Sequence, residues 1–492
     1  MSPMLQTTQR LHAFRAMPAW RSMQRLAMLS TLLLALTGCG GGGGSPGACV
    51  GSAAVCSPSQ NTQNPPGLST DSVSSLANIC TPEGEKRWVR AYLDDVYLWY
   101  QEIIDVTPAA YATPQDYFYA LLVRPKDRFS FTAPQADIDQ YYQSGQEIGY
   151  GANFVNQGDH LRVAYTDPNT PAAQQNIIRG AEIIAINGVP IEQVSAADRI
   201  TALYPSAVGA SNQFTVLDAG SAAARTVRLN AVIVIKSPVP ATTIINTVDS
   251  KKIGYLAFTD HVATAEAPLI AAMTQFQQGG IDDLVLDLRY NSGGFLYIAS
   301  ELAAMIGGAS VQGKVFEQLQ FNAKHPEKTS DPGNRIDFPT VSTNDSPLPQ
   351  LNLTRVFVLT GPDTCSASES IINSLSPFMQ VISIGGTTCG KPYGFIQKNN
   401  CSTAYFAIQF AGVNNAGQGS YTNGFAPACA VADDLEHPLG DIRERLLQTA
   451  IAYRASGSCP ATGLTQALTA RYAPAAVREV YRAPWRDNRL LK

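Results

Sequence analysis

The residues best suited to chemistry gather between positions 364 and 395, in TCSASESIINSLSPFMQVISIGGTTCGKPYGF. Ser366 lies near the start of this stretch, and Lys391 follows it after 25 positions, between two glycine-containing turns. A serine attacks a carbonyl only when a base takes its proton, and a lysine can be that base if burial lowers its pKa by several units. The pair predicts acyl transfer by a serine nucleophile, although serine-rich helix starts are usually caps.

A histidine is the more usual base for a serine, and the chain has five. His261, in FTDHVATAE, is the one histidine of the α/β region that could be this base, and a surface loop is the other explanation for it. The other four lie elsewhere. His12 is near the N-terminus and His160 is in a β-rich region, whereas His325 is in a polar stretch and His437 is near a probable helix start. Cys365 is an alternative nucleophile, although a disulfide or a buried thiol explains it as well.

Strand-like and helical runs alternate from residue 250 onward, and they decide where the candidate residues would lie. The strand-like runs are KIGYLAF, DLVLDL, RVFVLT and VISIGG, and the helical runs are APLIAAMTQFQQ, FLYIASELAAMI and SESIINSL. This alternation predicts an α/β fold with a largely parallel sheet. Ser366 would follow RVFVLT and open the next helix, whose N-terminus favours negative charge beside it. In LVLDLRYNSGG, Asn291, Gly293 and Gly294 allow a tight turn that could aim N–H groups outward.

The first half of the chain divides into a helical and a β-rich region. EKRWVRAYLDDVYLWYQEII carries apolar residues at helical spacing, and in TPQDYFYALLV Thr113 can cap a helix that has Pro114 in its first turn. From about residue 145 short β-rich runs follow one another, and Asn187-Gly188 is a strong hairpin signal. A helical region ahead of a β-rich domain is therefore expected.

The N-terminus predicts export. Arginines precede a short apolar run, LAMLSTLLLAL, which suits a signal-peptide core and is too short to span a bilayer. The run ends in LTGC, which resembles a bacterial lipobox and would leave Cys39 carrying lipid. A Gly/Ser run suited to a flexible tether follows it. A plain secretory signal, or a chance cysteine after an apolar run, is the alternative.

Cysteine content and charge narrow the class of protein further. Besides Cys39 there are eight cysteines, an even number that favours disulfides in an oxidising compartment: Cys49, Cys56, Cys80, Cys365, Cys389, Cys401, Cys429 and Cys459. A zinc site is not expected, because there is no CxxC spacing. The formal charge of -4 gives no basic footprint, so nucleic acid is not an expected partner.

Two motifs resemble the C-terminal processing (tail-specific) peptidase family. VFVLTGPDTCSASESIINSL with GGTTCGKPYG is similar to its Ser-x-Ser-x-Ser-Glu-like stretch and downstream Gly-Lys, and LVLDLRYNSGG to its Asp-Leu-Arg-x-Asn-x-Gly-Gly loop. The resemblance places the nucleophile on Ser366 and the catalytic lysine on Lys391. It places oxyanion-hole N–H donors on Ala367 and on Gly293, with Gly294 as the alternative. It implies a crotonase/ClpP-like α/β protease core, a Ser/Lys serine endopeptidase, and no metal or organic cofactor.

The match departs from the family pattern around the lysine. Some members orient the lysine with a glutamine four residues later, where this chain has Phe395, and others use an aspartate at the position of Pro377. Gln397 and Glu369 are the candidates for this orienting role. A lysine base also needs an apolar site that disfavours the ammonium, and Tyr393 and Phe395 could supply it.

The β-rich region resembles a PDZ domain. Its Gly149-Tyr150-Gly151 loop precedes a strand, and IIRGAEIIAINGVPI is close to the family's pattern, although the usual Gly-Asp pair is altered. In such domains a peptide tail adds as a strand to an open sheet edge, and loop N–H groups hold its carboxylate. The resemblance implies that polypeptide substrates are selected by their C-terminal tails. A β-subdomain that only packs is the alternative.

Six segments are expected: a lipoprotein signal peptide at 1–38, a tether at 39–75, a helical region at 76–143, a PDZ-like domain at 144–240, a serine peptidase core at 241–455 and a tail at 456–492. The expected protein is an exported bacterial lipoprotein of the cell envelope, anchored to a membrane by its lipid. Gly40 after Cys39 favours the outer membrane, facing the periplasm. Two alternatives keep the fold: a catalytically silent peptide- or ligand-binding lipoprotein, and a structural envelope protein that docks through the PDZ-like part.

Overall fold

The computed structural model describes residues 72–460, 478–479 and 489–490, all of which belong to one compact unit. The expected signal peptide, the lipobox cysteine Cys39 and most of the tether lie outside the described residues. Within the described part of the chain, no helix is both long and apolar enough to cross a membrane.

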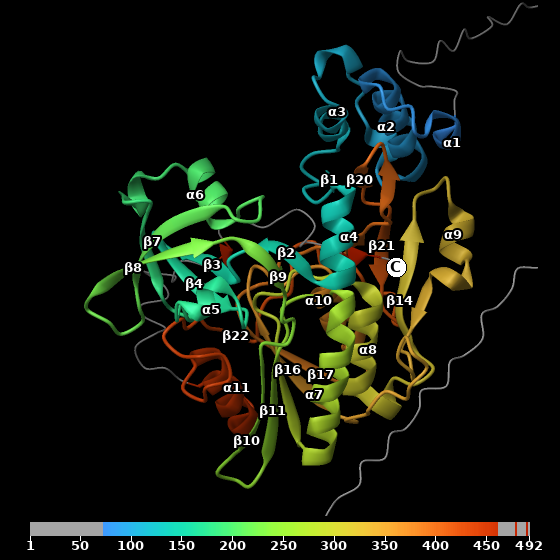
Figure 1. Ribbon diagram of the computed structural model, residues 1–492. Helices are drawn as coiled ribbons and strands as arrows, with labels where there is room; N and C mark the ends of the chain where they lie inside the picture. Colours follow the sequence, from blue (N-terminus) through green and yellow to red (C-terminus); the bar gives the residue numbers. More distant parts are fainter. Residues whose placement is uncertain (1–71, 461–477, 480–488, 491–492) are drawn as a thin grey trace, which may run out of the picture. The chain divides into compact units, whose positions relative to one another are not determined.

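A six-stranded sheet forms the centre of the α/β region, and all its strands run parallel except the first (Figure 1). In spatial order it consists of β10 (Ala241–Asn246), β11 (Lys252–Ala257), β12 (Asp283–Asp287), β16 (Arg355–Thr360), β17 (Gln380–Gly385) and β22 (Cys429–Ala430). The middle strands are apolar runs because both faces of the sheet are covered. The prediction of a largely parallel α/β core is confirmed.

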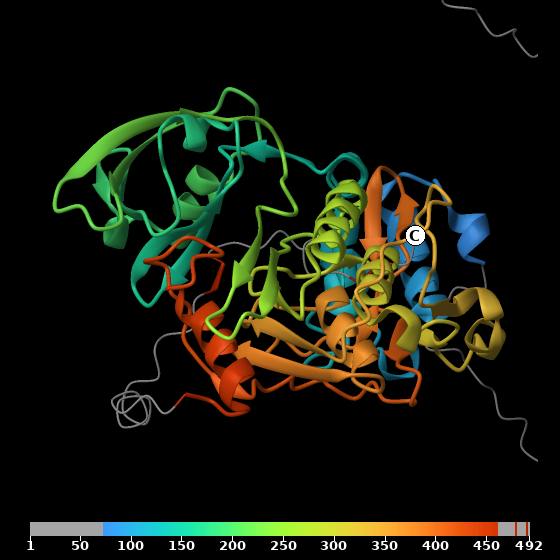
Figure 2. The ribbon, with the colours of Figure 1, turned by 90° about the horizontal axis from the view of Figure 1, so that it is seen from below.

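Helices cover both faces of this sheet (Figure 2). On one face lie α7 (Glu266–Gly279), α8 (Leu296–Gly307) and α10 (Ala367–Leu375), and on the other lies α11 (Arg445–Ser456). Side chains alternate between the faces along β12. Leu286 belongs to the hydrophobic cluster of the first face, whereas Val285 shares a cluster with Leu447 of α11.

The N-terminal helices share the hydrophobic core of the α/β region. They are α1 (Val73–Leu76), α2 (Pro82–Val96), α3 (Pro114–Leu121) and α4 (Gln135–Ser144), beside the small sheet β1 (Phe131–Pro134), β20 (Thr403–Phe406) and β19 (Lys398–Asn400). The Trp88 ring of α2 lies 5.1 Å from the Tyr405 ring of β20. A disulfide joins Cys80 to Cys401. The helical region is therefore fastened to the α/β core by packing and by a covalent bond.

Local hydrogen bonds decide where these helices begin and end. The Thr113 hydroxyl accepts a bond from Asp116 N–H and caps α3, with Pro114 in the first turn, as predicted. Helix α2 ends earlier than its apolar run predicts. The main chain becomes extended at Tyr97, which ends the helix. The Tyr97 hydroxyl donates a hydrogen bond to Asp127.

Residues 150–231 form a β-subdomain with a hydrophobic core of its own. Its sheet has the order β23-β3-β4-β5-β7-β8, with β3 (Ala152–Gln157), β4 (His160–Thr166), β5 (Glu182–Ile186), β7 (Ser211–Leu217), β8 (Ala224–Asn230) and, from much later in the chain, β23 (Arg478–Glu479). The predicted hairpin at Asn187-Gly188 is confirmed, because both residues have positive φ and join β5 to β6 (Val189–Pro190). The ribbon of β2 (Gln146–Gly149) and β9 (Val232–Ile235) leads into and out of the β-subdomain.

A further sheet lies beside the catalytic region. Its order is β15 (Arg335–Asp337), β14 (Val315–Phe321), β21 (Phe410–Val413) and β18 (Tyr393–Gly394). The short strand β13 (Gly294–Phe295) pairs with β24 (Arg489–Leu490), which also comes from much later in the chain. Another disulfide, Cys429–Cys459, joins β22 to the residues after α11. Disulfides among the described residues agree with a location outside the cytoplasm.

Candidate active site

Four loops meet at the carboxyl edge of the parallel sheet, where α/β proteins place their functional groups. His261 follows β11, Asn291 and Gly293 follow β12, Ser366 follows β16, and Lys391 follows β17. Hydrogen bonds join neighbouring loops, because Asn291 O accepts from Cys365 N–H at 3.2 Å and from Ser368 Oγ at 2.9 Å. The sheet therefore gathers residues that lie up to 130 positions apart in the sequence.

Ser366 occupies a strained backbone position at the N-cap of α10. Its φ of 59° and ψ of -115° lie in a region that favours glycine. Such strain persists where the surroundings enforce it and is common at functional sites. The side chain is fully buried, and its Oγ makes no hydrogen bond within the described part of the chain.

The carboxylate of Glu369 connects the Ser366 segment to the Lys391 segment. It accepts hydrogen bonds from the N–H groups of Ser366, Gly390 and Lys391, at 3.0, 2.8 and 2.8 Å. The Thr388 hydroxyl donates a fourth bond at 2.5 Å. Burial raises the pKa of Glu369, and the four hydrogen bonds oppose that rise. One buried carboxylate thus holds the main chain of both candidate catalytic residues.

A disulfide fastens the same two segments. It joins Cys365, next to Ser366, to Cys389, two residues before Lys391, with the Cα atoms 5.1 Å apart. Cys389 N–H also donates to Thr364 O at 3.0 Å. Because the Cys365 sulfur is spent in this bond, it is not a free thiol that could act as the nucleophile.

Lys391 is fully buried and lies against aromatic rings. Its Nζ is 4.1 Å from the centre of the Phe395 ring and 5.1 Å from that of the Phe129 ring. Phe395 thus stands where the sequence suggested an apolar wall, whereas Tyr393 packs edge-on against Trp99 at 5.0 Å. Phe129 could not be identified from the sequence, because nothing in its local pattern links it to a lysine 262 positions later.

Gln397 is one of the two candidates for orienting the lysine. Its side-chain amide donates to Asp139 and Asn399, in a partly exposed place. The position four residues after Lys391 is filled by the Phe395 ring instead. The orienting role of Gln397 thus stays a prediction that these bonds do not support, whereas Glu369, the other candidate, accepts a hydrogen bond from Lys391 N–H.

The loop after β12 is shaped by its glycines and by Asn291. Gly293 and Gly294 have φ values of 106° and 139°, and a Cβ at Gly294 would lie 2.3 Å from His261 O. Gly293 N–H donates to Asn291 Oδ1 at 3.0 Å, so the expected oxyanion donor is engaged within its own loop. Ala367 is the first residue of α10, where an N–H group has no acceptor inside the helix.

His261 lies in the interior rather than in the surface loop that its sequence context suggested. Its Nδ1 lies 2.9 Å from Asn291 Oδ1, and Asn291 Nδ2 donates to Phe258 O. We therefore assign the proton to Nδ1, which leaves Nε2 as a bare lone pair that has no hydrogen-bond partner among the described residues. Burial lowers the pKa of His261 to about 4, so the ring is neutral at pH 7.

One group of side chains has the composition of a metal site. Within the described ranges, Cys365, Glu369 and Cys389 bring two sulfurs and a carboxylate within 4.8 Å of one another. The sulfurs are bonded to each other, and the carboxylate already accepts four hydrogen bonds. These three residues are therefore poorly suited to hold an ion.

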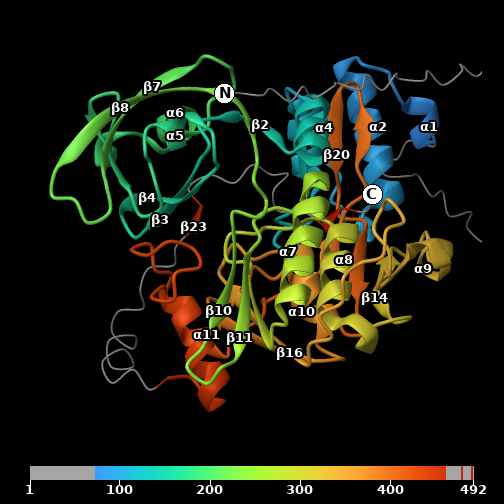
Figure 3. The ribbon, with the colours of Figure 1, turned by 60° about the horizontal axis from the view of Figure 1, so that its bottom comes forward.

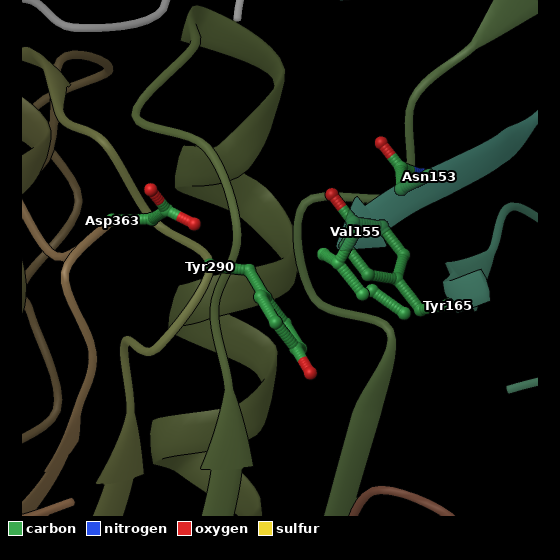
Figure 4. Close-up of a pocket in the computed structure, with 6 residues that line it drawn as sticks. Asn153, Val155, Tyr165, Tyr290 and Asp363 are labelled. Atoms are coloured by element: carbon green, nitrogen blue, oxygen red, sulfur yellow. The ribbon is translucent and has the colours of Figure 1, made fainter. Parts of the chain in front are cut away.

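The β-subdomain contacts the catalytic loops directly. A small cavity of about 10 Å³ separates strands β3 and β4 from the loops after β12 and β16 (Figure 4). It is lined by Asn153, Val155, Ala164 and Tyr165 on one side and by Tyr290 and Asp363 on the other. Tyr290 belongs to the same loop as Asn291, and Asp363 lies three residues before Ser366.

A buried charge network crosses this contact. Arg179 of the β-subdomain donates to the Tyr290 hydroxyl at 2.7 Å and to Asp433 at 2.9 Å. Arg289 donates to Asp433 and to Glu444, both at 2.7 Å. Burial alone would raise the pKa of Asp433, but the two guanidinium groups and the Tyr290 hydroxyl lower it to about 2. The loop after β12 is thus held by fixed charges on its outer side.

The Gly149-Tyr150-Gly151 loop lies at the start of β3. Tyr150 O accepts from Ala172 N–H at 3.0 Å, and Gly151 O accepts from Asp167 N–H at 2.7 Å. The Tyr150 side chain is buried in the core of the β-subdomain. The carbonyl groups of the loop are thus used internally.

Two family models match this chain and cover both the helical region and the catalytic loops. The peptidase S41 N-terminal domain matches residues 84–131, and peptidase family S41 matches residues 252–423, a range that includes Ser366 and Lys391. The segment that carries the candidate catalytic residues thus matches peptidase family S41. Both matched ranges lie outside the β-subdomain.

Known proteins agree with this assignment. Carboxyl-terminal-processing proteases of Picosynechococcus sp. and Synechocystis sp. are 27% and 23% identical over 51% of this chain. These alignments cover 55% and 53% of the two proteins, so the chain spans about half the length of the curated relatives it matches. The crystal structure of a candidate S41 protease from Bacteroides fragilis covers 75% of this chain and 97% of its own, at 23% identity and a TM-score of 0.61, and supports the fold.

Proposed function

We propose that this protein is a serine endopeptidase in which Ser366 is the nucleophile and Lys391 the general base. The observation that carries the proposal is the double fastening of their segments by Glu369 and by the Cys365–Cys389 disulfide. Fastened segments keep a nucleophile and its base in reacting geometry, which can supply several kcal/mol of the barrier.

In the proposed reaction, neutral Lys391 Nζ takes the Ser366 proton while Oγ bonds to the substrate carbonyl carbon. The resulting oxyanion accepts a hydrogen bond from Ala367 N–H. The ammonium then protonates the departing amine, the C–N bond breaks, and an acyl-enzyme remains. A water attacks this ester with Lys391 again as base, releasing the acid and restoring Ser366. Gly293 N–H would join Ala367 only after Asn291 Oδ1 released it, and Gly294 is the alternative.

Two kinds of contact would hold Lys391 for this task. Glu369 fixes its main chain, and the rings of Phe395 and Phe129 confine its side chain. Burial disfavours the ammonium, whereas the faces of aromatic rings favour it, so the two effects act in opposite directions on the lysine pKa. The proposal requires burial to dominate, because only the neutral amine accepts a proton.

We propose further that the β-subdomain is a PDZ-like domain that selects polypeptides by their C-terminal tails. The edge of β3 and the N–H groups of the Gly149-Tyr150-Gly151 loop would receive the tail. Peptides with a free C-terminus should then bind more tightly than the same peptides with an amidated end. Equal affinities in a titration would exclude carboxylate capture.

The location proposed for this enzyme is the cell envelope, with a lipid on Cys39 and the outer membrane as its site, facing the periplasm. The disulfides among the described residues support an exported protein, and the lipobox supports the anchor. Mass spectrometry of the mature N-terminus tests it. An unmodified N-terminus elsewhere than at Cys39 would contradict the anchor.

Cleavage of a denatured, tail-tagged protein tests the proposed activity. Wild type should cleave it, whereas Ser366→Ala, Lys391→Ala and Lys391→Arg should not, since a guanidinium keeps the charge but is not a base. Lys398→Arg, at an exposed position, is the matched control and should retain full activity. If Lys391→Arg cleaved at the wild-type rate while Ser366→Ala was inactive, His261 would become the base to test. If wild type bound peptides without cleaving them, the silent binding lipoprotein would replace this proposal.

A further inference from the structure

A segment late in the chain occupies the free edge of the β-subdomain. β23 pairs antiparallel with β3, with Arg478 opposite Asn156 and Glu479 opposite Val155 (Figure 3). On its other side β3 pairs with β4, so β23 is the outermost strand of that sheet. From Arg478 to Glu479 the segment runs toward the start of β3, where the Gly149-Tyr150-Gly151 loop lies. This is the edge to which the proposed function assigns the tail of a substrate.

The same segment reaches the catalytic loops ten residues later. β24 pairs in parallel with β13, with Arg489 opposite Gly294 and Leu490 opposite Phe295. It also lies against β18, which begins two residues after Lys391. β24 is therefore placed between the strand that follows the Gly293 loop and the strand that follows the candidate base. A polypeptide substrate would have to enter this region for Ser366 to reach its carbonyl.

The order in which the segment meets the two edges differs from that of a tail substrate. In a tail substrate the terminal residues lie on β3, and the bond to be cleaved, which precedes them, lies at Ser366. In this segment the earlier residues, 478–479, lie on β3, and the later ones, 489–490, lie at the catalytic strand. It therefore uses both peptide edges in the order opposite to the one that productive binding requires.

We propose that β23 and β24 act as an internal peptide ligand that competes with substrate for both edges and so inhibits the enzyme. The inference rests on the proposed function for the meaning of the two edges. Main-chain pairing is what β-strand addition uses, so the competitor needs no particular side chains. Because it is tethered, its effective concentration is in the millimolar range typical of short linkers. A competitor of modest intrinsic affinity would then raise the apparent KM on the order of tenfold.

The test is a full-length variant in which proline removes a main-chain N–H from each strand, Glu479→Pro with Leu490→Pro. Its apparent KM for an extended peptide should be about tenfold lower than that of wild type, with kcat unchanged. Glu479→Ala with Leu490→Ala, which keeps both main-chain N–H groups, is the matched control and should behave as wild type. A synthetic peptide of residues 476–492 should restore the higher KM when it is added to the variant.

A binding measurement separates failure of this inference from failure of the proposed function. Two proteins are compared: Ser366→Ala alone, and Ser366→Ala combined with Glu479→Pro and Leu490→Pro. The fluorescently labelled 476–492 peptide should bind the second protein at least tenfold more tightly than the first. This result is expected whether or not the protein cleaves anything. Equal binding to both chains, or an unchanged KM in the double-proline variant, would overturn the inference. So would a loss of thermal stability accompanied by loss of kcat, which would make the two strands structural.

Discussion

Glu369 and Asp433 are two carboxylates near the candidate active site, and their surroundings differ: Glu369 contacts the segments of Ser366 and Lys391, and Asp433 contacts Arg179 and Arg289. Glu369 is fully buried and receives only hydrogen bonds, from three N–H groups and a hydroxyl, and burial raises its pKa. The Asp433 side chain is 11% exposed and faces two guanidinium groups, and its pKa is lowered to about 2. Neutral donors surround the carboxylate beside Ser366 and Lys391, here called the catalytic side, and fixed charges surround the carboxylate at the contact with the β-subdomain, here called the outer side.

The difference suggests a division of labour. The buried ion pairs of Arg289 and Arg179 make a rigid junction. Removing either partner of such a pair leaves the other charge buried without compensation, which is strongly destabilising. Hydrogen bonds to Glu369 hold the main chain of Ser366 and Lys391 without placing a cation beside the lysine, which has to lose its proton in the proposed reaction. The catalytic side thus positions the main chain of Ser366 and Lys391, and the outer side attaches the β-subdomain to the α/β core.

The largest effect is expected from removing the cation on the outer side. Arg289→Ala leaves Asp287 and Glu444 buried without their shared partner, so the free energy of unfolding should fall by about 3–5 kcal/mol. Urea unfolding measures this change. Arg335→Ala, which breaks an exposed pair with Asp337, is the matched control and should leave the midpoint unchanged. A similar response to both substitutions would mean that burial of the network contributes nothing.

Glu369 variants address the catalytic side. Glu369→Ala removes every acceptor that aims the two segments and should lower kcat/KM about a hundredfold, which is the scale of a misplaced catalytic group. Glu369→Gln keeps an acceptor and the shape, so it should retain much more activity. Because burial raises the pKa of Glu369, the carboxylate also makes the fold less stable as pH rises above its ordinary value of 4.5, and Glu369→Gln should remove that dependence. Equal losses of activity in the two variants would contradict a positioning role through acceptors.

Acid titration distinguishes the two carboxylates directly. The folded pKa of Asp433, about 2, lies below its ordinary value of 3.8, so its contribution is complete above pH 4 and is lost as pH falls toward 2. That contribution is about 2 kcal/mol. Asp433→Asn should be less stable than wild type at pH 5 and nearly equal to it at pH 2. A constant difference in unfolding free energy between pH 5 and pH 2 would contradict the ion-pair explanation.

The smallest expected effect concerns the strained backbone of Ser366. Both Ser366→Gly and Ser366→Ala should be inactive, but the glycine variant should be more stable by about 1 kcal/mol, because φ of 59° suits glycine. At Ser370, inside α10, the order should reverse, with alanine more stable than glycine by about 1 kcal/mol. Thermal unfolding of the four variants measures both differences. If glycine and alanine ranked in the same order of stability at both positions, the backbone of Ser366 would not be strained.

Much of this arrangement could be predicted from the sequence, and the exceptions have physical reasons. The apolar runs of β12 and β16, followed by Gly293 and Ser366, place loops at one sheet edge by local pattern alone. Phe129 could not be predicted, because its contact with Lys391 depends on how the helical region packs on the core. The direction of the Gln397 amide could not be predicted either, because it depends on a contact with Asp139 of the helical region.

Two further features were hidden because they depend on pairings between distant parts of the chain. Gly293 N–H is engaged because Asn291 turns its Oδ1 inward, a side-chain choice that no motif encodes. Strands β23 and β24 are too short to produce a periodic signal, and they form only against the edges of β3 and β13. Short edge strands take their structure from the partner rather than from their own propensity.

The most direct test of the central claim is the rate at which a fluorophosphonate labels Ser366, followed by mass spectrometry between pH 6 and pH 10. We expect a single labelled site in wild type and no labelling of Ser366→Ala. The rate of labelling of wild type should rise with pH as Lys391 loses its proton. Lys391→Arg should label at least a hundredfold more slowly than wild type, and about as slowly as Lys391→Ala, because general-base catalysis is lost in both. Labelling of Lys391→Arg at the wild-type rate, or labelling that persists in Ser366→Ala, would contradict the Ser366/Lys391 pair.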